Sequence, residues 1–221
     1  MRRYLRCALA WLAFVAIPGI SGAQDIPGYP SVDSFDPREV ALLPAYCKYT
    51  TYFNKKVPGG SDITAIRSWQ SALGPTFEHV HHYCFGLMKT NRAVLLSTNP
   101  QVRNFYLTDS LKEFDYVLER SSEGFVLLPE ILAKKGENLL RLKRAPLAMM
   151  EFERAVSLKP DYWPPFAQMS DYYKSIGDNA RARESLERGL AGSPDAPALT
   201  RRLQELASAA KAPAKSASRT K

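Results

Sequence analysis

All three histidines of the chain lie within one seven-residue stretch, EHVHHYC, which ends in a cysteine. The histidines are His79, His81 and His82, and the cysteine is Cys84. Imidazole and thiolate groups bind transition metals, and a thiolate beside an imidazole can act as a nucleophile. Residues three apart share a helix face, so a helix here would pair His79 with His82 and His81 with Cys84. Three hypotheses follow: a metal site, a nucleophilic thiol, or a disulfide among packing histidines.

Motif spacing gives no support to the metal and haem hypotheses. The chain contains no Cys-x-x-Cys, no His-Glu-x-x-His and no Cys-x-x-Cys-His, the spacings that zinc sites and haem attachment commonly use. No acidic cluster beside the histidines offers further metal ligands. The choice among the hypotheses therefore depends on the redox conditions that the cysteines meet.

The start of the chain is typical of an export signal. Residues 1–23 comprise a basic start (MRRYLR), an apolar run (CALAWLAFVAIPGI) and the small residues SGA that a signal peptidase reads. Pro18 and Gly19 break the apolar run, which is short for a membrane span of about 20 residues. Cleavage before Gln24 is therefore favoured over retention as a membrane anchor. We expect an exported, periplasmic protein with no transmembrane segment after cleavage.

Export bears directly on the cysteines. Removing Cys7 with the signal peptide leaves only Cys47 and Cys84. An oxidising compartment removes free thiols, and with them the thiolate that a nucleophile requires. We therefore expect a Cys47–Cys84 disulfide beside packing or capping histidines. The alternative is a metal-binding or redox protein centred on His81, His82 and Cys84.

The charge distribution argues against one class of partner. The whole chain has a formal net charge of +8, but three arginines belong to the signal peptide and four cations to the tail 209–221, which leaves about +1 between them. A nucleic-acid-binding domain carries a basic face, so no nucleic-acid partner is expected. The Ala-, Lys-, Ser- and Pro-rich tail is expected to be disordered.

The chain also lacks nucleophile-elbow and phosphate-loop motifs, so we expect neither catalysis nor a cofactor.

Helix signals organise the N-terminal helical segment 24–76. The run DPREV places Asp36 and Glu39 in a capping pattern at a helix start. Ser61 is expected to cap a helix that ends at Leu73.

Residues 77–128 are expected to form a long antiparallel helical hairpin. Its first helix should run to the motif STNP, where Asn99 can cap and Pro100 can open the second helix. Apolar residues fall mainly on one face of that second helix.

From Pro129 onward the sequence repeats itself with a spacing of 34 residues. The block PEILAKKGENLLRLKRAPLAMMEFERAVSLKP aligns with WPPFAQMSDYYKSIGDNARARESLERGLAGSP, and the blocks end at Pro160 and Pro194. The matched positions are Leu132 with Phe166, Leu139 with Tyr173, Ala148 with Ala182, Phe152 with Leu186, and Ala155 with Gly189. This pattern of large, small and aromatic residues resembles the tetratricopeptide repeat.

The resemblance implies an all-α fold: helical hairpins stacked as a short right-handed solenoid behind a helical N-terminal part. Its repeats would be residues 129–162 and 163–196, followed by a cap helix at 197–208 and then the tail. The hairpin 77–128 would be a degenerate third repeat. Within that hairpin, Phe85 and Gly86 stand at the family's Leu-Gly positions, and Ser110, Phe114 and Val117 at its Ala-aromatic-Ala positions.

The resemblance also implies a groove that is lined by the first helix of each unit and binds peptides or proteins. The groove positions expected from it are Lys134, Glu137, Arg141, Gln168, Asp171 and Lys174. Family members that clamp a carboxyl terminus use Lys and Asn where this chain has Ala133 with Glu137 and Ala167 with Asp171, so that clamp is missing. We expect a non-catalytic scaffold or assembly factor that binds another protein or peptide of the bacterial cell envelope.

Overall fold

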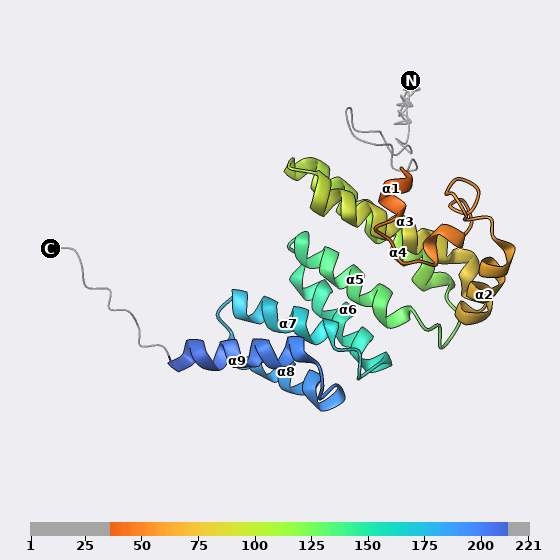
Figure 1. The fold of residues 1–221 in the computed structure, drawn as a ribbon. Helices are drawn as coiled ribbons and strands as arrows, with labels where there is room; N and C mark the ends of the chain where they lie inside the picture. Colours follow the sequence, from red (N-terminus) through yellow and green to blue (C-terminus); the bar gives the residue numbers. More distant parts are fainter. Residues whose placement is uncertain (1–35, 212–221) are drawn as a thin grey trace, which may run out of the picture.

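The computed structural model describes residues 36–211 (Figure 1). Over this range the chain is all-helical and contains no strand, which confirms the all-α part of the expected fold. The predicted signal peptide at 1–23, the start of the segment 24–76 and the tail from 212 lie outside the described residues. None of the helices between 36 and 211 has the length and apolarity that crossing a membrane requires.

The chain forms nine α-helices over the described range. They are α1 (Pro37–Val40), α2 (Ile63–Leu73), α3 (Val80–Asn91), α4 (Pro100–Arg120), α5 (Leu128–Arg141), α6 (Ala145–Leu158), α7 (Pro164–Ser175), α8 (Asn179–Gly192) and α9 (Pro197–Lys211). Two 3₁₀ turns, Cys47–Tyr49 and Pro75–His79, and one π-helical turn, Arg92–Leu96, join them.

Consecutive helices pack against one another as hairpins. Helix α3 packs on α4, α5 on α6, and α7 on α8, and each hairpin contacts the next. Figure 1 shows the hairpins following one another in chain order, with α9 beside the last of them. Helix α7 also contacts both α5 and α9, so these three helices lie in one row.

Two predicted helix starts show how local sequence sets the boundaries. Asn99 caps α4 as expected, because its Oδ1 accepts hydrogen bonds from the backbone N–H groups of Gln101 (2.8 Å) and Val102 (3.3 Å). The predicted cap of α2 was wrong by one residue. Asp62, not Ser61, accepts from the first-turn N–H groups of α2. Both residue types make good caps, and the carboxylate also gains from the positive end of the helix dipole.

Two other boundaries differ from the sequence prediction. The first helix of the hairpin 77–128 is not continuous, because a 3₁₀ turn precedes α3 and the π-helical turn Arg92–Leu96 follows it. At the other end, α9 continues to Lys211, three residues beyond the predicted cap helix 197–208. The added residues include two alanines and a lysine, which favour helix over coil.

The two cysteines tie the N-terminal segment to the first hairpin. The Sγ atoms of Cys47 and Cys84 lie 2.11 Å apart and their Cα atoms 5.7 Å apart, which is disulfide geometry, as the sequence analysis expected. Both residues are fully buried. The bond joins the 3₁₀ turn Cys47–Tyr49 to the middle of α3.

Glycines set the spacing inside two of the hairpins. A Cβ atom built on Gly136 of α5 would lie 2.5 Å from the ring of Phe152 on α6. A Cβ on Gly86 of α3 would likewise overlap the ring of Phe114 on α4. In each hairpin a fully buried phenylalanine therefore packs directly on the backbone of its partner helix.

We expect the substitution Gly136→Ala to destabilise the protein, although alanine favours helix over glycine by about 1 kcal/mol. The added methyl group would collide with the Phe152 ring, and such overpacking costs about 1–3 kcal/mol. Chemical denaturation would measure the loss. The control is Arg183→Ala on the exposed surface of α8. If Gly136→Ala is as stable as the control, the close contact does not determine the hairpin spacing.

Candidate functional site

The residues of the EHVHHYC stretch each have a separate structural partner. Cys84 is bonded to Cys47. The Nδ1 atom of His82 lies 2.6 Å from Glu113 Oε2, and that of His81 lies 2.9 Å from the backbone oxygen of Glu78, to which it donates a hydrogen bond. Over the described range, no three His, Cys, Asp or Glu side chains gather in a way that could hold a metal ion. The alternative ligand set His81, His82 and Cys84 is therefore not assembled around a common point.

Glu113 also belongs to a buried charge network between α3 and α4. The Nζ atom of Lys89 lies 2.5 Å from Glu113 and 2.7 Å from Asp109, and the Lys89 side chain is 3 % exposed. Burial disfavours the ammonium ion, but hydrogen bonds to Asp109 and Glu113 outweigh this effect and raise the pKa of Lys89 above its ordinary value. The network therefore joins α3 and α4 through hydrogen bonds between charged groups.

His81 lies in an environment that disfavours its charged form. Burial, followed by repulsion from the neighbouring His82, lowers the pKa of His81 from 6.5 to about 4. Its ring packs 4.3 Å from the His82 ring and 5.1 Å from that of Tyr52, measured between centroids. The imidazole is therefore neutral at pH 7 and acts as a packing and capping group.

A surface hollow of about 300 Å³ lies along the outer face of α5. We call it the α5 groove. Its lining residues are Leu42, Leu43 and Pro44 from the segment after α1, Leu87, Thr90 and Asn91 from α3, Val94 and Leu95 from the π-helical turn, and Glu130, Lys134, Glu137 and Arg141 from α5. Three of the predicted groove residues, Lys134, Glu137 and Arg141, thus lie on one wall of a real hollow.

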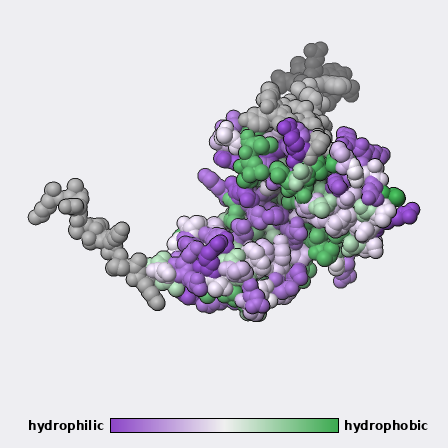
Figure 2. Space-filling view, in the orientation of Figure 1, coloured by the Kyte–Doolittle hydropathy of each residue, from purple (hydrophilic) through white to green (hydrophobic). Residues whose placement is uncertain are grey.

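The opposite rim of the α5 groove is apolar and exposed. Leu42 is 63 %, Val94 47 % and Leu95 62 % exposed. Figure 2 shows hydrophobic surface beside α1 and at the end of the α3–α4 hairpin. Large apolar side chains that gather at a hollow are typical of interaction surfaces.

Arg92 and Glu39 hold this apolar rim in place. The Arg92 guanidinium is 1 % exposed and donates two hydrogen bonds to the Glu39 carboxylate, at 2.7 and 2.8 Å. Glu39 lies in α1 and Arg92 opens the π-helical turn. A bidentate pair of this kind fixes geometry as well as charge, so α1 and the turn are held together on one side of the groove.

The α5 wall presents positive charge to solvent. Glu137 lies beneath two cations: its carboxylate accepts a 3.0 Å hydrogen bond from Lys134 and lies 3.6 Å from Arg141. The Lys134 and Arg141 side chains are 36 % and 37 % exposed, whereas that of Glu137 is only 12 % exposed. A second carboxylate, Glu130, accepts a 2.7 Å hydrogen bond from the buried hydroxyl of Tyr83. The two cations of this wall are thus more exposed than Glu137, with which both are paired.

Beneath the groove, the buried amide of Asn138 joins three helices. Its Nδ2 atom donates hydrogen bonds to Thr90 Oγ1 on α3 (2.6 Å) and Ser110 Oγ on α4 (2.8 Å). Its Oδ1 accepts a 3.1 Å hydrogen bond from Arg141. Asn138 is fully buried, so these hydrogen bonds replace those that water would have made.

The other three predicted groove residues lie elsewhere. Asp171 pairs with Arg202 of α9 at 2.9 Å, and Lys174 lies 3.6 Å from Glu205 of α9. Gln168 is partly buried on α7. None of the three lines the α5 groove, so the six predicted residues fall into two separate sets.

The sequence analysis missed the apolar half of the groove. The sequence analysis placed Leu42 in the N-terminal helical segment 24–76, and Val94 and Leu95 in the first helix of the hairpin 77–128. The one available signal was the run AVLL at 93–96, in which consecutive large apolar residues cannot all face the interior of one helix.

We expect Asn138→Leu to lower the free energy of unfolding by about 2–3 kcal/mol, because the polar atoms of Thr90 and Ser110 would lose a buried partner. The matched control is Asn104→Leu on the exposed face of α4, which should change stability by less than about 0.5 kcal/mol. Urea denaturation would measure the free energy of unfolding of both variants. Equal stability of the two would mean that the amide does not join the helices.

The pKa of His81 predicts a pH dependence of stability. The folded pKa, about 4, lies below the unfolded value near 6.5, so the unfolded chain binds a proton first as the pH falls. Stability contributed by neutral His81 is complete above about pH 6.5 and is lost between there and about pH 4. We expect His81→Asn, which can still donate to Glu78, to flatten this part of the profile. An unchanged slope in His81→Asn would contradict the assignment.

Comparison with known proteins assigns the chain to no family, since a scan against protein-family models finds no matching model and a search of curated proteins finds no match.

Proposed function

We propose that this chain is an exported, non-catalytic adaptor or assembly factor of the bacterial cell envelope, and that it holds a partner protein or peptide in the α5 groove. The observation that carries the proposal is the pairing of an exposed apolar rim, Leu42, Val94 and Leu95, with the outward-facing cations Lys134 and Arg141. Apolar side chains supply binding energy, and charges at the rim orient and select the partner.

We also propose that the scaffold is a short right-handed solenoid of the tetratricopeptide type. Support comes from the contact that two hairpins share. Gly136 packs on Phe152 in the first repeat block, and Gly86 packs on Phe114 in the upstream hairpin, at the positions that the resemblance aligned. In the second block Ser170 takes the place of this glycine and is also buried. The row formed by α5, α7 and α9 is consistent with a groove lined by the first helix of each unit.

The proposal of export rests on the cysteines and the N-terminal sequence. A buried bond between Cys47 and Cys84 is typical of proteins that mature in an oxidising compartment. The apolar and small-residue pattern of residues 1–23 is typical of a signal peptide. Both features fit a periplasmic location.

The groove suggests how a partner would bind. Apolar side chains of the partner would pack between Leu42 and Leu95, and acidic side chains would approach Lys134 and Arg141. Binding then needs no bond to be made or broken, in keeping with a scaffold.

The test compares two substitutions that each replace an exposed apolar residue by aspartate. Leu95→Asp places a charge in the apolar rim, whereas Met150→Asp makes a similar change at an equally exposed residue of α6 (62 % and 61 % exposed) that does not line the groove. We expect Leu95→Asp to reduce co-purification of the partner from envelope extracts at least roughly tenfold, and Met150→Asp to leave it unchanged. Lys134→Glu should weaken capture in a salt-dependent manner. Circular dichroism would check that each variant is folded.

If capture is unchanged in both Leu95→Asp and Lys134→Glu, the α5 groove is not the binding surface. If no partner co-purifies with the wild-type protein after cross-linking in intact cells, the adaptor function itself fails.

A further inference from the structure

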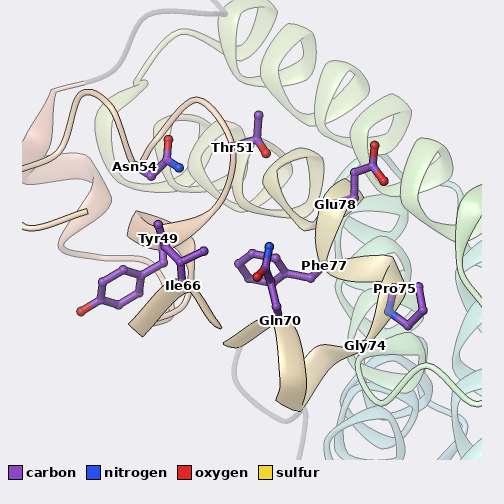
Figure 3. Close-up of a pocket in the computed structure, with 9 residues that line it drawn as sticks. All are labelled: Tyr49, Thr51, Asn54, Ile66, Gln70, Gly74, Pro75, Phe77 and Glu78. Carbon is purple, nitrogen blue, oxygen red and sulfur yellow. The ribbon is translucent and has the colours of Figure 1, made fainter. Parts of the chain in front are cut away.

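A second hollow lies away from the α5 groove, between the N-terminal loops and α2 (Figure 3). Its volume is about 560 Å³, within the range of about 300–1,000 Å³ that is usual for small-molecule sites. Its lining residues are Tyr49, Thr51, Asn54, Ile66, Gln70, Gly74, Pro75, Phe77 and Glu78. We call it the α2 pocket, and it shares no residue with the α5 groove.

The lining of the α2 pocket selects against charged ligands. No lysine, arginine or histidine lines it, so an anion would find no countercharge. Glu78 is its one carboxylate, and Figure 3 shows the Glu78 side chain turned away from the centre of the pocket. An uncharged ligand is therefore favoured over an ionic one.

Three neutral side chains offer hydrogen bonds to such a ligand. Figure 3 shows Thr51, Asn54 and Gln70 around one space, with the ring of Phe77 on its floor. Among the described residues, none of these three side chains makes a hydrogen bond within the protein. An amide offers both donors and an acceptor, which is what a hydroxyl group, itself donor and acceptor, can match.

The wall that carries Thr51 and Asn54 is held rigidly. Cys47 anchors it through the disulfide, and Thr50 Oγ1 donates a 2.8 Å hydrogen bond to the Cys47 backbone oxygen. Gly60 packs so closely on the wall that an added Cβ would lie 2.5 Å from the backbone oxygen of Lys48. A site that is already ordered loses less entropy when a ligand binds.

We propose that the α2 pocket binds a neutral polyhydroxyl ligand, namely a sugar unit of an uncharged oligosaccharide. Its hydroxyl groups would hydrogen-bond to Asn54, Gln70 and Thr51, and its less polar ring face would pack on Phe77 and Ile66. This site is independent of the partner groove, so the chain would recognise a glycan and a protein on different surfaces.

Calorimetric titration of the folded protein tests the proposal. The probes are neutral tetrasaccharides of glucose, mannose, galactose and N-acetylglucosamine, with tetragalacturonate as the acidic comparison. We expect at least one neutral probe to bind, and Asn54→Ala and Gln70→Ala each to weaken that binding roughly tenfold through loss of ligand hydrogen bonds. Neither change removes a hydrogen bond within the described protein. Gln204→Ala, an exposed glutamine of α9, is the matched control and should bind as wild type does.

The proposal is overturned if no neutral probe binds, if the two pocket variants bind as the control does, or if tetragalacturonate binds as tightly as the neutral probes. The Leu95→Asp variant separates this site from the partner groove. It should retain saccharide binding in full, whether or not it still captures a partner protein.

Discussion

The α5 groove depends on one buried amide. Asn138 fixes the α3–α4 hairpin to α5 by donating to Thr90 and Ser110, and its oxygen holds Arg141. A buried polar network in which every member is paired favours a single arrangement, because a shifted packing would leave groups unpaired. The distance between the apolar rim and the cationic wall follows from this junction. The glycine contacts at Phe114 and Phe152 set the spacing within each hairpin, whereas Asn138 sets the relation between hairpins.

Features encoded by neighbouring residues could be predicted from the sequence. The pair Asn99 and Pro100 marked the start of α4, because capping needs only groups within one turn. The spacing of Pro160 and Pro194 placed the ends of α6 and α8 to within a few residues. The cysteine pair was predicted by counting, since removal of the predicted signal peptide would leave two cysteines. Lys134, Glu137 and Arg141 were named from the repeat resemblance, and they share one wall of the α5 groove because they recur along one face of α5.

Features made by distant residues could not be predicted. The π-helical turn exposes Val94 and Leu95 because Arg92 is drawn to Glu39, a partner 53 residues earlier in the chain. Neither the periodicity of apolar residues nor helix propensity indicates the pairing of Arg92 with Glu39. Asp171 looked like an open groove position, but it pairs with Arg202, whose proximity depends on how α9 packs. The α2 pocket escaped notice because its walls come from separate loops that the disulfide brings together.

The sequence separation between contacting residues differs between the two halves of the molecule, and so does the speed with which their contacts can form. From α5 to α9 most contacts join consecutive helices, which close short loops and form quickly. The N-terminal half instead relies on pairs 37 to 53 residues apart, such as Cys47 with Cys84 and Tyr83 with Glu130. The α5 groove draws on residues from Leu42 to Arg141, so a chain growing from its N-terminus cannot complete it until α5 has emerged. Until then Leu42, Val94 and Leu95 lack the wall that faces them, which under the proposed function would disfavour premature capture of a partner.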